Sequence, residues 1–199
     1  MANRFGLQQL RQCLDHVVLF IVTVGFTVEA GIVYVPEDRG QQGTIRPLPI
    51  FQNVTLPSLN RTSRNGFLQL ANEFALTREY TKRLELRAAS LDVPLATLSG
   101  GNQQKVVIAK WLATTPKIII LDEPTKGIDI GSKAAVHAFM AELAAQGLAV
   151  IMVSSEIPEI LGMSDRVIVM REGRIATEAA GNGLTPENLV RYAAGLKEA

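Results

Sequence analysis

The 199-residue sequence contains one cysteine, Cys13, and lacks any uninterrupted apolar run of about 20 residues, the length that crosses a bilayer. A single cysteine excludes an internal disulfide and a cysteine-based zinc site, which fits a reducing, cytosolic setting. The formal net charge is only +1, and no run of lysine or arginine stands out. Because nucleic-acid binding depends on concentrated positive charge, no nucleic-acid partner is expected.

The sequence also lacks a loop of the form G-x-x-x-x-G-K-[ST], the glycine-rich cradle that binds the phosphates of a nucleoside triphosphate. Its absence from these residues excludes tight, independent ATP binding of that kind. What is present is the composition of a globular domain, with 47% hydrophobic and 20% charged residues. A chain of this length and composition can bury one core, so we expect one α/β domain.

The most apolar stretch, residues 17–28 ("VVLFIVTVGFTV"), is rich in β-branched residues and predicts a buried strand. A signal peptide is the alternative, which Asp15 and His16 disfavour because they adjoin the apolar stretch. A second apolar run, residues 32–35, breaks at Pro36 into a charged loop. It predicts a strand that delivers polar side chains from its end.

Residues 66–89 are predicted to be mostly helical. After Leu98, apolar strand-like runs alternate with helical segments, a pattern typical of a parallel sheet with crossover helices. The expected fold class is therefore α/β. The apolar positions that recur at roughly helical spacing in and just after the first helical segment are Leu70, Phe74, Leu84 and Leu91.

Two carboxylates, Asp122 and Glu123, follow the apolar run of "KIIILDE". A run that is apolar at every position predicts a parallel strand covered on both faces. Ligands of an open α/β sheet bind at the carboxyl ends of its strands, so Asp122 could hold magnesium and Glu123 could orient or activate water. Acidic residues also end strands in plain loops, so this pair does not decide the function by itself.

A helix start precedes that strand, in "LSGGNQQKVVIAKWLA". Ser99 is a good N-cap residue, and Gly100 and Gly101 leave the backbone open. The unpaired N–H groups and the positive end of the helix dipole predict an anion site suited to a terminal phosphate. An ordinary capped helix is the alternative. Two apolar pairs at four-residue spacing support the helix, Val107 with Trp111 and Ile108 with Leu112.

The remaining segments are predicted to be scaffold. A helix from Ser132 ends near Gly147, and its His137 is expected to be a surface residue of the helix without a ligand role. A buried strand then covers residues 148–155, and Pro158 marks the first turn of the next helix. A hairpin is expected to turn at Glu172-Gly173, and Thr185 is expected to cap a terminal helix. The apolar face of the helix from Ser132 is formed by Val136, Met140 and Leu143.

The strings "LSGGNQQK", "IIILDEPT" and "KGID", in this order and close together, resemble the signature motif, Walker B strand and D-loop of the ABC-transporter ATPases. "VPEDR" and "VSSEIPEILGMSDRVIVMREGRI" are similar to the second cassette of the double-cassette ATPases that drive bacterial sugar importers. The resemblance runs from about Gly31 to the end of the sequence. It implies a partial sheet of the P-loop NTPase type with a helical signature subdomain.

The implied organisation is an atypical segment over residues 1–30 and a partial cassette over residues 31–199. The resemblance places the helical subdomain at about residues 50–112 and the Walker B, D-loop and switch core at about residues 113–199. Because the Walker A segment stands before "VPEDR" in the family, the sequence resembles a truncated cassette.

The resemblance also implies residue roles, with ATP and magnesium as cofactors. Asp122 would hold magnesium, Glu123 would polarise the attacking water, and Asp129 would communicate between paired cassettes. Glu37 and Ser155 occupy positions where the family usually has glutamine and histidine, which implies an altered hydrolytic core. The residues that would contact the γ-phosphate of ATP held mainly by the opposite cassette are Ser99, Gly100, Gly101, Asn102 and Gln103.

The implied partners are a second ATP-binding cassette, the transmembrane permease subunits and, indirectly, a periplasmic sugar-binding protein. The implied location is cytoplasmic, at the inner face of the plasma membrane through the permease. Three readings stay open at this stage: the ATPase subunit of a sugar importer, active only with a partner cassette; a non-enzymatic module that completes a partner's ATP site; and an inactive remnant. The sugar itself cannot be deduced from cassette motifs.

Overall fold

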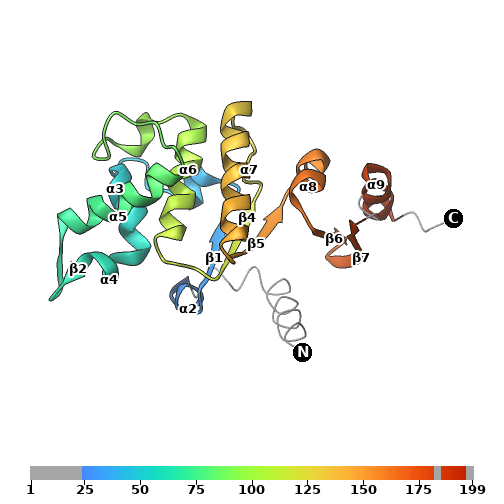
Figure 1. Cartoon of the computed structure of the whole chain (residues 1–199), viewed down its shortest axis with the longest axis horizontal. Helices are drawn as coiled ribbons and strands as arrows, with labels where there is room; N and C mark the ends of the chain where they lie inside the picture. Colours follow the sequence, from blue (N-terminus) through green and yellow to red (C-terminus); the bar gives the residue numbers. More distant parts are fainter. Residues whose placement is uncertain (1–23, 182–184, 196–199) are drawn as a thin grey trace.

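A three-stranded parallel sheet lies at the centre of the computed structural model, which describes residues 24–181 and 185–195 (Figure 1). Its strands are β1 (Ile32–Val35), β4 (Ile118–Asp122) and β5 (Ala149–Val153), in the order β1-β4-β5. Val35 pairs with Leu121, and Leu121 pairs with Met152. In this register the three strands end at one edge, so the loops that follow them are neighbours.

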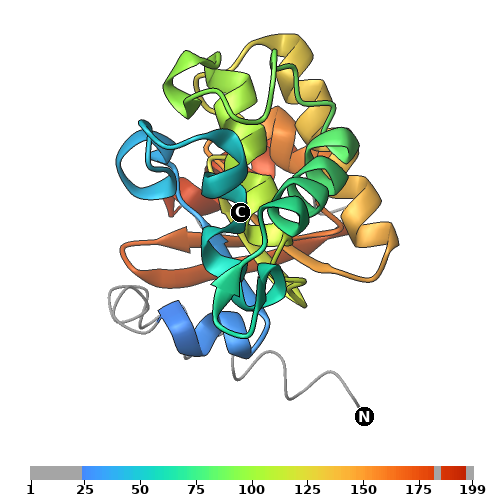
Figure 2. The same ribbon diagram turned by 90° about the vertical axis from the view of Figure 1, so that its left-hand side faces the viewer.

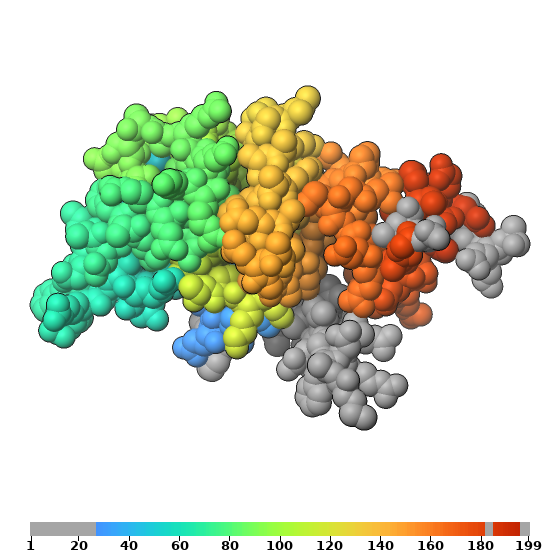
Figure 3. All heavy atoms as spheres, in the orientation of Figure 1, coloured from blue at the N-terminus to red at the C-terminus, as the bar shows by residue number. Residues whose placement is uncertain are grey.

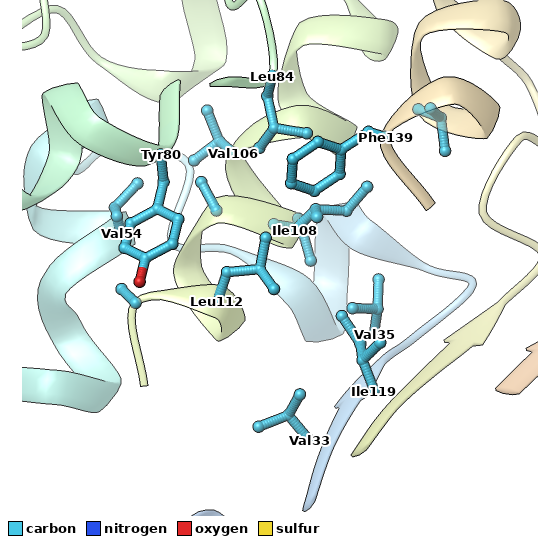
Figure 4. Packing of buried hydrophobic residues seen from close by; sticks show 14 of the residues in the cluster. Val33, Val35, Val54, Tyr80, Leu84, Val106, Ile108, Leu112, Ile119 and Phe139 are labelled. Atoms are coloured by element: carbon cyan, nitrogen blue, oxygen red, sulfur yellow. The ribbon is translucent and has the colours of Figure 1, made fainter. Parts of the chain in front are cut away.

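The helices between β1 and β4 form one side of the molecule, and α6 joins them to the sheet (Figures 1 and 2). Ile108 and Leu112 of α6 lie between the strand residues Val35 and Ile119 and the aromatic side chain of Tyr80 (Figure 4). These side chains are all buried. The elements on this side are α3 (Ile50–Thr55), η3 (Leu56–Ser58), α4 (Leu59–Thr62), β2 (Ser63–Arg64), β3 (Phe67–Leu68), α5 (Leu70–Arg83), η4 (Leu95–Thr97) and α6 (Gly100–Leu112).

The elements after β4 extend the molecule along its long axis toward the carboxyl end of the chain (Figure 3). They are α7 (Ile130–Ala145), β5, α8 (Ile157–Met163), the antiparallel pair β6 (Arg166–Arg171) and β7 (Arg174–Ala180), and α9 (Pro186–Ala194). Glu172 and Gly173 have φ of 52° and 75°, the left-handed conformation that a tight hairpin turn requires. The predicted hairpin, the α9 cap by Thr185 and the α7 stop before Gly147 are confirmed.

Three sequence-based predictions were wrong in part. Residues 24–29 form helix α2 (Val24–Glu29) instead of continuing a strand, and residues 17–23 lie outside the described part. The predicted helix over residues 66–89 is the shorter α5, and its Leu70 is 58% exposed. β5 is not buried: it is the edge of the described sheet, and Val153 is 48% exposed. Apolar content alone did not determine these features. Whether a segment forms a strand or a helix, and whether a strand lies at the edge or the centre of a sheet, depends on neighbours distant in sequence.

The prediction that the strand before Glu123 is covered on both faces was also wrong in part, because only one face of β4 is fully buried. Ile119 and Leu121 are fully buried in the core that also contains residues of α6 and α7, whereas Ile118 and Ile120 on the other face are only partly buried. Among the described residues, no helix is both long and apolar enough to cross a lipid bilayer.

Candidate functional site

The candidate site lies at the carboxyl edge of the sheet, where the loops after β1, β4 and β5 meet. Asp122 is the last residue of β4, and Glu123 follows it with a φ of 46°, a conformation uncommon for a residue other than glycine. Glu37 comes from the loop after β1 and Ser155 from the loop after β5. The sheet therefore brings together four of the sequence-predicted site residues, as expected for a parallel α/β sheet.

Asp122 is held by a residue that the motif analysis missed. The Tyr34 hydroxyl donates to Oδ2 of Asp122 at 2.7 Å, from the neighbouring strand β1. Burial raises the pKa of Tyr34 far above its usual value, and the hydrogen bond to Asp122 and the carboxylate charges of Asp122 and Glu37 raise it further. The phenol therefore stays protonated and acts as a donor that orients the carboxylate. Only strand register could have identified Tyr34, since nothing in its local sequence points to Asp122.

Glu123 is held by the loop after β5. Its backbone N–H donates to the carbonyl of Val153 at 2.8 Å, and its Oε1 accepts a hydrogen bond from the Ser155 N–H, also at 2.8 Å. The contact of Ser155 with Glu123 is thus made by the main chain and does not depend on a histidine side chain. Together these bonds fix both the backbone and the carboxylate of Glu123 beside Asp122.

The loop after β1 is attached to the loop after β4. Glu37 forms an ion pair with Lys126 at 2.7 Å, and Arg39 donates to the carbonyls of Lys126 at 3.2 Å and Gly127 at 3.5 Å. Asp38 accepts the N–H groups of the next short turn, which begins the π-helical segment η2 (Arg39–Gly43). Glu37, predicted to contact the cofactor, is therefore engaged with a cation from the Asp122-Glu123 loop. Arg39 and Lys126 were not predicted individually as site residues.

The start of α6 has the predicted position but not the predicted cap. Ser99 is the N-cap residue, yet its hydroxyl caps no backbone N–H and instead accepts a hydrogen bond from Asn102 Nδ2 at 3.1 Å. Asn102 Oδ1 accepts from the N–H of Arg87 at 3.1 Å, and Gln103 Nε2 donates to the carbonyl of Leu98 at 2.8 Å. These polar side chains shape the loop, and the first-turn N–H groups of α6 keep the character of an anion site.

Gly101 is required by the chain's own packing. A Cβ at this position would lie 2.3 Å from Ser132 Oγ and 2.8 Å from Ser132 Cβ, in the first turn of α7. Asp129 is the N-cap of α7 and accepts hydrogen bonds from the Ser132 N–H at 2.9 Å and the Ser132 hydroxyl at 2.7 Å. These bonds lower the pKa of Asp129. The start of α6 and the start of α7 are thus in close contact within one chain.

His137 was predicted to be a surface residue of α7, and this was only partly right. Its side chain is only 27% exposed, and Nε2 lies 2.6 Å from Oε1 of Glu159, a buried carboxylate on α8. Helical periodicity places His137 beside the apolar face of α7 but cannot show that Glu159 of α8 lies against it.

The donor set fits magnesium held in the way that proteins hold it with a nucleotide. Among the described residues, no cluster of three or more His, Cys, Asp or Glu side chains could bind a metal by itself. Magnesium commonly takes one or two carboxylates and completes its shell with substrate phosphates and water. Tyr34 orients Asp122 through Oδ2, and Oδ1 of the same carboxylate could therefore bind magnesium. The edge can therefore support a phosphate-bound metal, with Glu123 beside it to orient water.

Comparison with known proteins shows the family of this chain. The sequence model described as "ABC transporter" matches residues 27–126. The ribose import ATP-binding protein RbsA 1 of Rhizobium meliloti (strain 1021) is 74% identical over 92% of this chain and 37% of that protein. The ribose import ATP-binding protein RbsA of Jannaschia sp. (strain CCS1) is 79% identical over 85% of this chain and 33% of that protein. The chain thus spans about a third of the length of these relatives.

Solved structures show the same fold. The ATP-binding cassette MJ0796, in a dimeric post-hydrolysis state bound to ADP and Pi, is 27% identical with a TM-score of 0.65, over 75% of this chain and 62% of that chain. The cassette MJ1267 is 22% identical with a TM-score of 0.64, over 83% of this chain and 69% of that chain. The fold described above is therefore similar to that of part of an ATP-binding cassette.

Proposed function

This chain belongs to the ABC transporter family, and we propose that it forms part of the ATP-binding subunit of a sugar importer, as a region of the second cassette. Ribose is the sugar named for its curated relatives, so a pentose is the proposed cargo. The observation that carries the proposal is the position of Asp122 and Glu123. They lie side by side at the end of the central strand, and each is oriented by a hydrogen bond from a neighbouring strand or loop.

In the proposed mechanism, Asp122 holds magnesium, which when bound neutralises phosphate charge. Glu123 orients the attacking water and accepts its proton, and the Ser155 N–H keeps the accepting carboxylate in place. Glu37 stays paired with Lys126 and so ties the loop after β1 to this core. The start of α6 would face ATP bound mainly by a second cassette, and Asp129 would communicate between the paired cassettes. The residues at this helix start are Ser99, Gly100, Gly101, Asn102 and Gln103.

The phosphate loop of this site is not among the 199 residues, so it would be supplied by further polypeptide. The described sheet can take another strand beside β5, because β5 is an edge strand and such a strand presents backbone N–H and C=O groups that a neighbouring strand can pair. The proposed partners are a second cassette, the permease subunits and, through them, a periplasmic sugar-binding protein. The proposed location is the cytoplasmic face of the plasma membrane.

A chimera tests this function. Residues 31–199 replace the matching region of the Jannaschia relative, which is 79% identical where the two align, and the product is reconstituted with that relative's permease in proteoliposomes. We expect ATP hydrolysis stimulated by ribose with its binding protein. Glu123→Gln in the chimera should lower kcat by about 10² to 10⁴, the usual contribution of a positioned general base. A folded chimera without ATPase activity, beside an active parent, would overturn the proposal.

A second candidate is a non-enzymatic module that completes the ATP site of a partner. It is favoured by one observation: the α6 start is complete, whereas the phosphate loop is absent from this sequence. In that case Glu123→Gln would leave the turnover of the chimera unchanged, while the α6 start would remain essential. Calorimetric titration of the isolated 199-residue chain with Mg-ATP should show no tight binding under either candidate.

A further inference from the structure

Glu159 is a buried carboxylate that the mechanism above does not use. Its side chain is 3% exposed, in the first turn of α8. No lysine or arginine of the described residues forms an ion pair with it, yet a buried charge is costly unless hydrogen bonds satisfy it. Its surroundings provide them.

Three donors converge on Glu159. The Ser154 hydroxyl donates to Oε2 at 2.5 Å, and the Thr125 hydroxyl donates to Oε1 at 2.9 Å. His137 Nε2 lies 2.6 Å from Oε1. Burial raises the pKa of Glu159, but the hydrogen bonds from Ser154, His137 and Thr125 outweigh it and lower that pKa overall. An ionised carboxylate can only accept, so His137 is the donor in this contact.

The donors come from three separate parts of the chain. Thr125 follows the Asp122-Glu123 pair after β4, Ser154 follows β5, and His137 lies on α7. Thr125 is 1% exposed, so this junction excludes bulk water. Glu159 therefore holds together the two strand ends that carry the candidate site.

The next residue along the chain leads to the proposed general base. Ser154 is fixed by Glu159, and the N–H of Ser155 donates to Glu123 at 2.8 Å. Among the described residues, that N–H is the one hydrogen-bond donor to the Glu123 carboxylate. Any movement of residues 154–155 would therefore release the carboxylate of Glu123.

We infer that Glu159 is a positioning residue: by fixing Ser154, it places the Ser155 N–H on Glu123 and so sets the orientation of the carboxylate that handles water. The inference rests on the proposed function for its effect on turnover. Its structural part, the link from Glu159 to the Ser155 amide, stands on the described contacts alone.

Hydrogen exchange at the Ser155 amide tests the link in the full 199-residue chain without requiring activity. Glu159→Gln should reduce protection of that amide about three- to tenfold, the loss of one ordinary hydrogen bond. Glu123→Ala should do the same, because it removes the acceptor. Glu178→Gln is the matched control, since Glu178 is an exposed ion-pair partner of Arg166 on the β6–β7 hairpin. Unchanged protection in Glu159→Gln would overturn the inference.

Turnover in the chimera tests the functional part. Glu159→Gln should lower kcat about tenfold or more with the KM for ATP nearly unchanged, because a misplaced catalytic group slows the chemical step. In a Glu123→Gln background it should have almost no further effect, since Glu159 acts through Glu123. An equal loss in both backgrounds would show a merely structural role. If the unsubstituted chimera is inactive but Glu159→Gln still lowers protection of the Ser155 amide, the proposed function is refuted and the link from Glu159 to Ser155 stands.

A milder pair of variants covers the case in which Glu159→Gln does not fold. Thr125→Val keeps the shape of the side chain but removes one donor, and Thr125→Ser restores a hydroxyl. We expect Thr125→Val to lower Ser155 protection and Thr125→Ser to recover it. Equal protection in both variants would contradict the inference.

Discussion

The hydroxyl of Tyr34 donates a 2.7 Å hydrogen bond to Oδ2 of Asp122, across the pair of parallel strands β1 and β4. The two residues are 88 positions apart in the sequence. This bond orients the carboxylate proposed to hold magnesium, and it places a phenol with a strongly raised pKa next to that carboxylate. It therefore gives a spectroscopic handle on the site.

Tyr34 should ionise well above the pH at which a free tyrosine does, about 10. Because the folded-state pKa is raised, this residue's contribution to stability is complete below the unfolded pKa and is lost as pH rises above it. Ultraviolet difference titration of the wild-type chain against Tyr34→Phe measures this directly. A Tyr34 signal centred near pH 10 in the folded chain would contradict the hydrogen bond.

Glu159 should contribute stability that depends on acid pH. Its folded-state pKa is lowered, so this contribution is present above the unfolded pKa of about 4.3 and is lost as pH falls through the folded pKa. Urea unfolding at pH 7 and at a series of lower pH values should show a smaller acid dependence in Glu159→Gln than in wild type. Glu156 and Lys133, which pair nearby, are unchanged in both proteins and so cancel. Parallel pH profiles would count against the lowered pKa.

Gly101→Ala should destabilise the chain by about 1–3 kcal/mol, the usual cost of overpacking, because the new Cβ would meet Ser132. Ser132→Gly removes both atoms of the clash. In the Ser132→Gly background, the cost of Gly101→Ala should therefore fall close to zero, which a double-mutant cycle in urea measures. Equal costs in the two backgrounds would show that the contact is not what excludes a side chain at Gly101.

Ile119→Ala should cost about 2–5 kcal/mol of the free energy of unfolding, as for other large-to-small changes in a packed core. Ile119 is fully buried on the central strand β4. Ile130→Ala is the matched control, because Ile130 is 86% exposed and its loss should change stability by less than about 0.5 kcal/mol. Similar effects of the two substitutions would mean that the described sheet is not the core of the isolated chain.

Local patterns in the sequence determined much of the scaffold. The apolar run before Asp122 gave a parallel strand, and "EG" between two strand-like segments gave the turn at Glu172 and Gly173. Such features depend on residues close in the chain, where side-chain periodicity and the φ values open to glycine decide the conformation. The motifs also indicated the carboxylates at the sheet edge, because parallel strands present their carboxyl ends together.

Tertiary structure alone decided what those residues contact. Nothing near Glu159 in the sequence indicates that it is buried among hydroxyls from two other loops and an imidazole from α7. The same holds for Gly101, where the space that a Cβ would need is occupied by Ser132 of α7, the next helix along the chain. A periodic pattern predicts which face of an element is apolar. The partner of a polar side chain depends on which distant segment packs against it. The packing of the whole hydrophobic core determines which segments become neighbours.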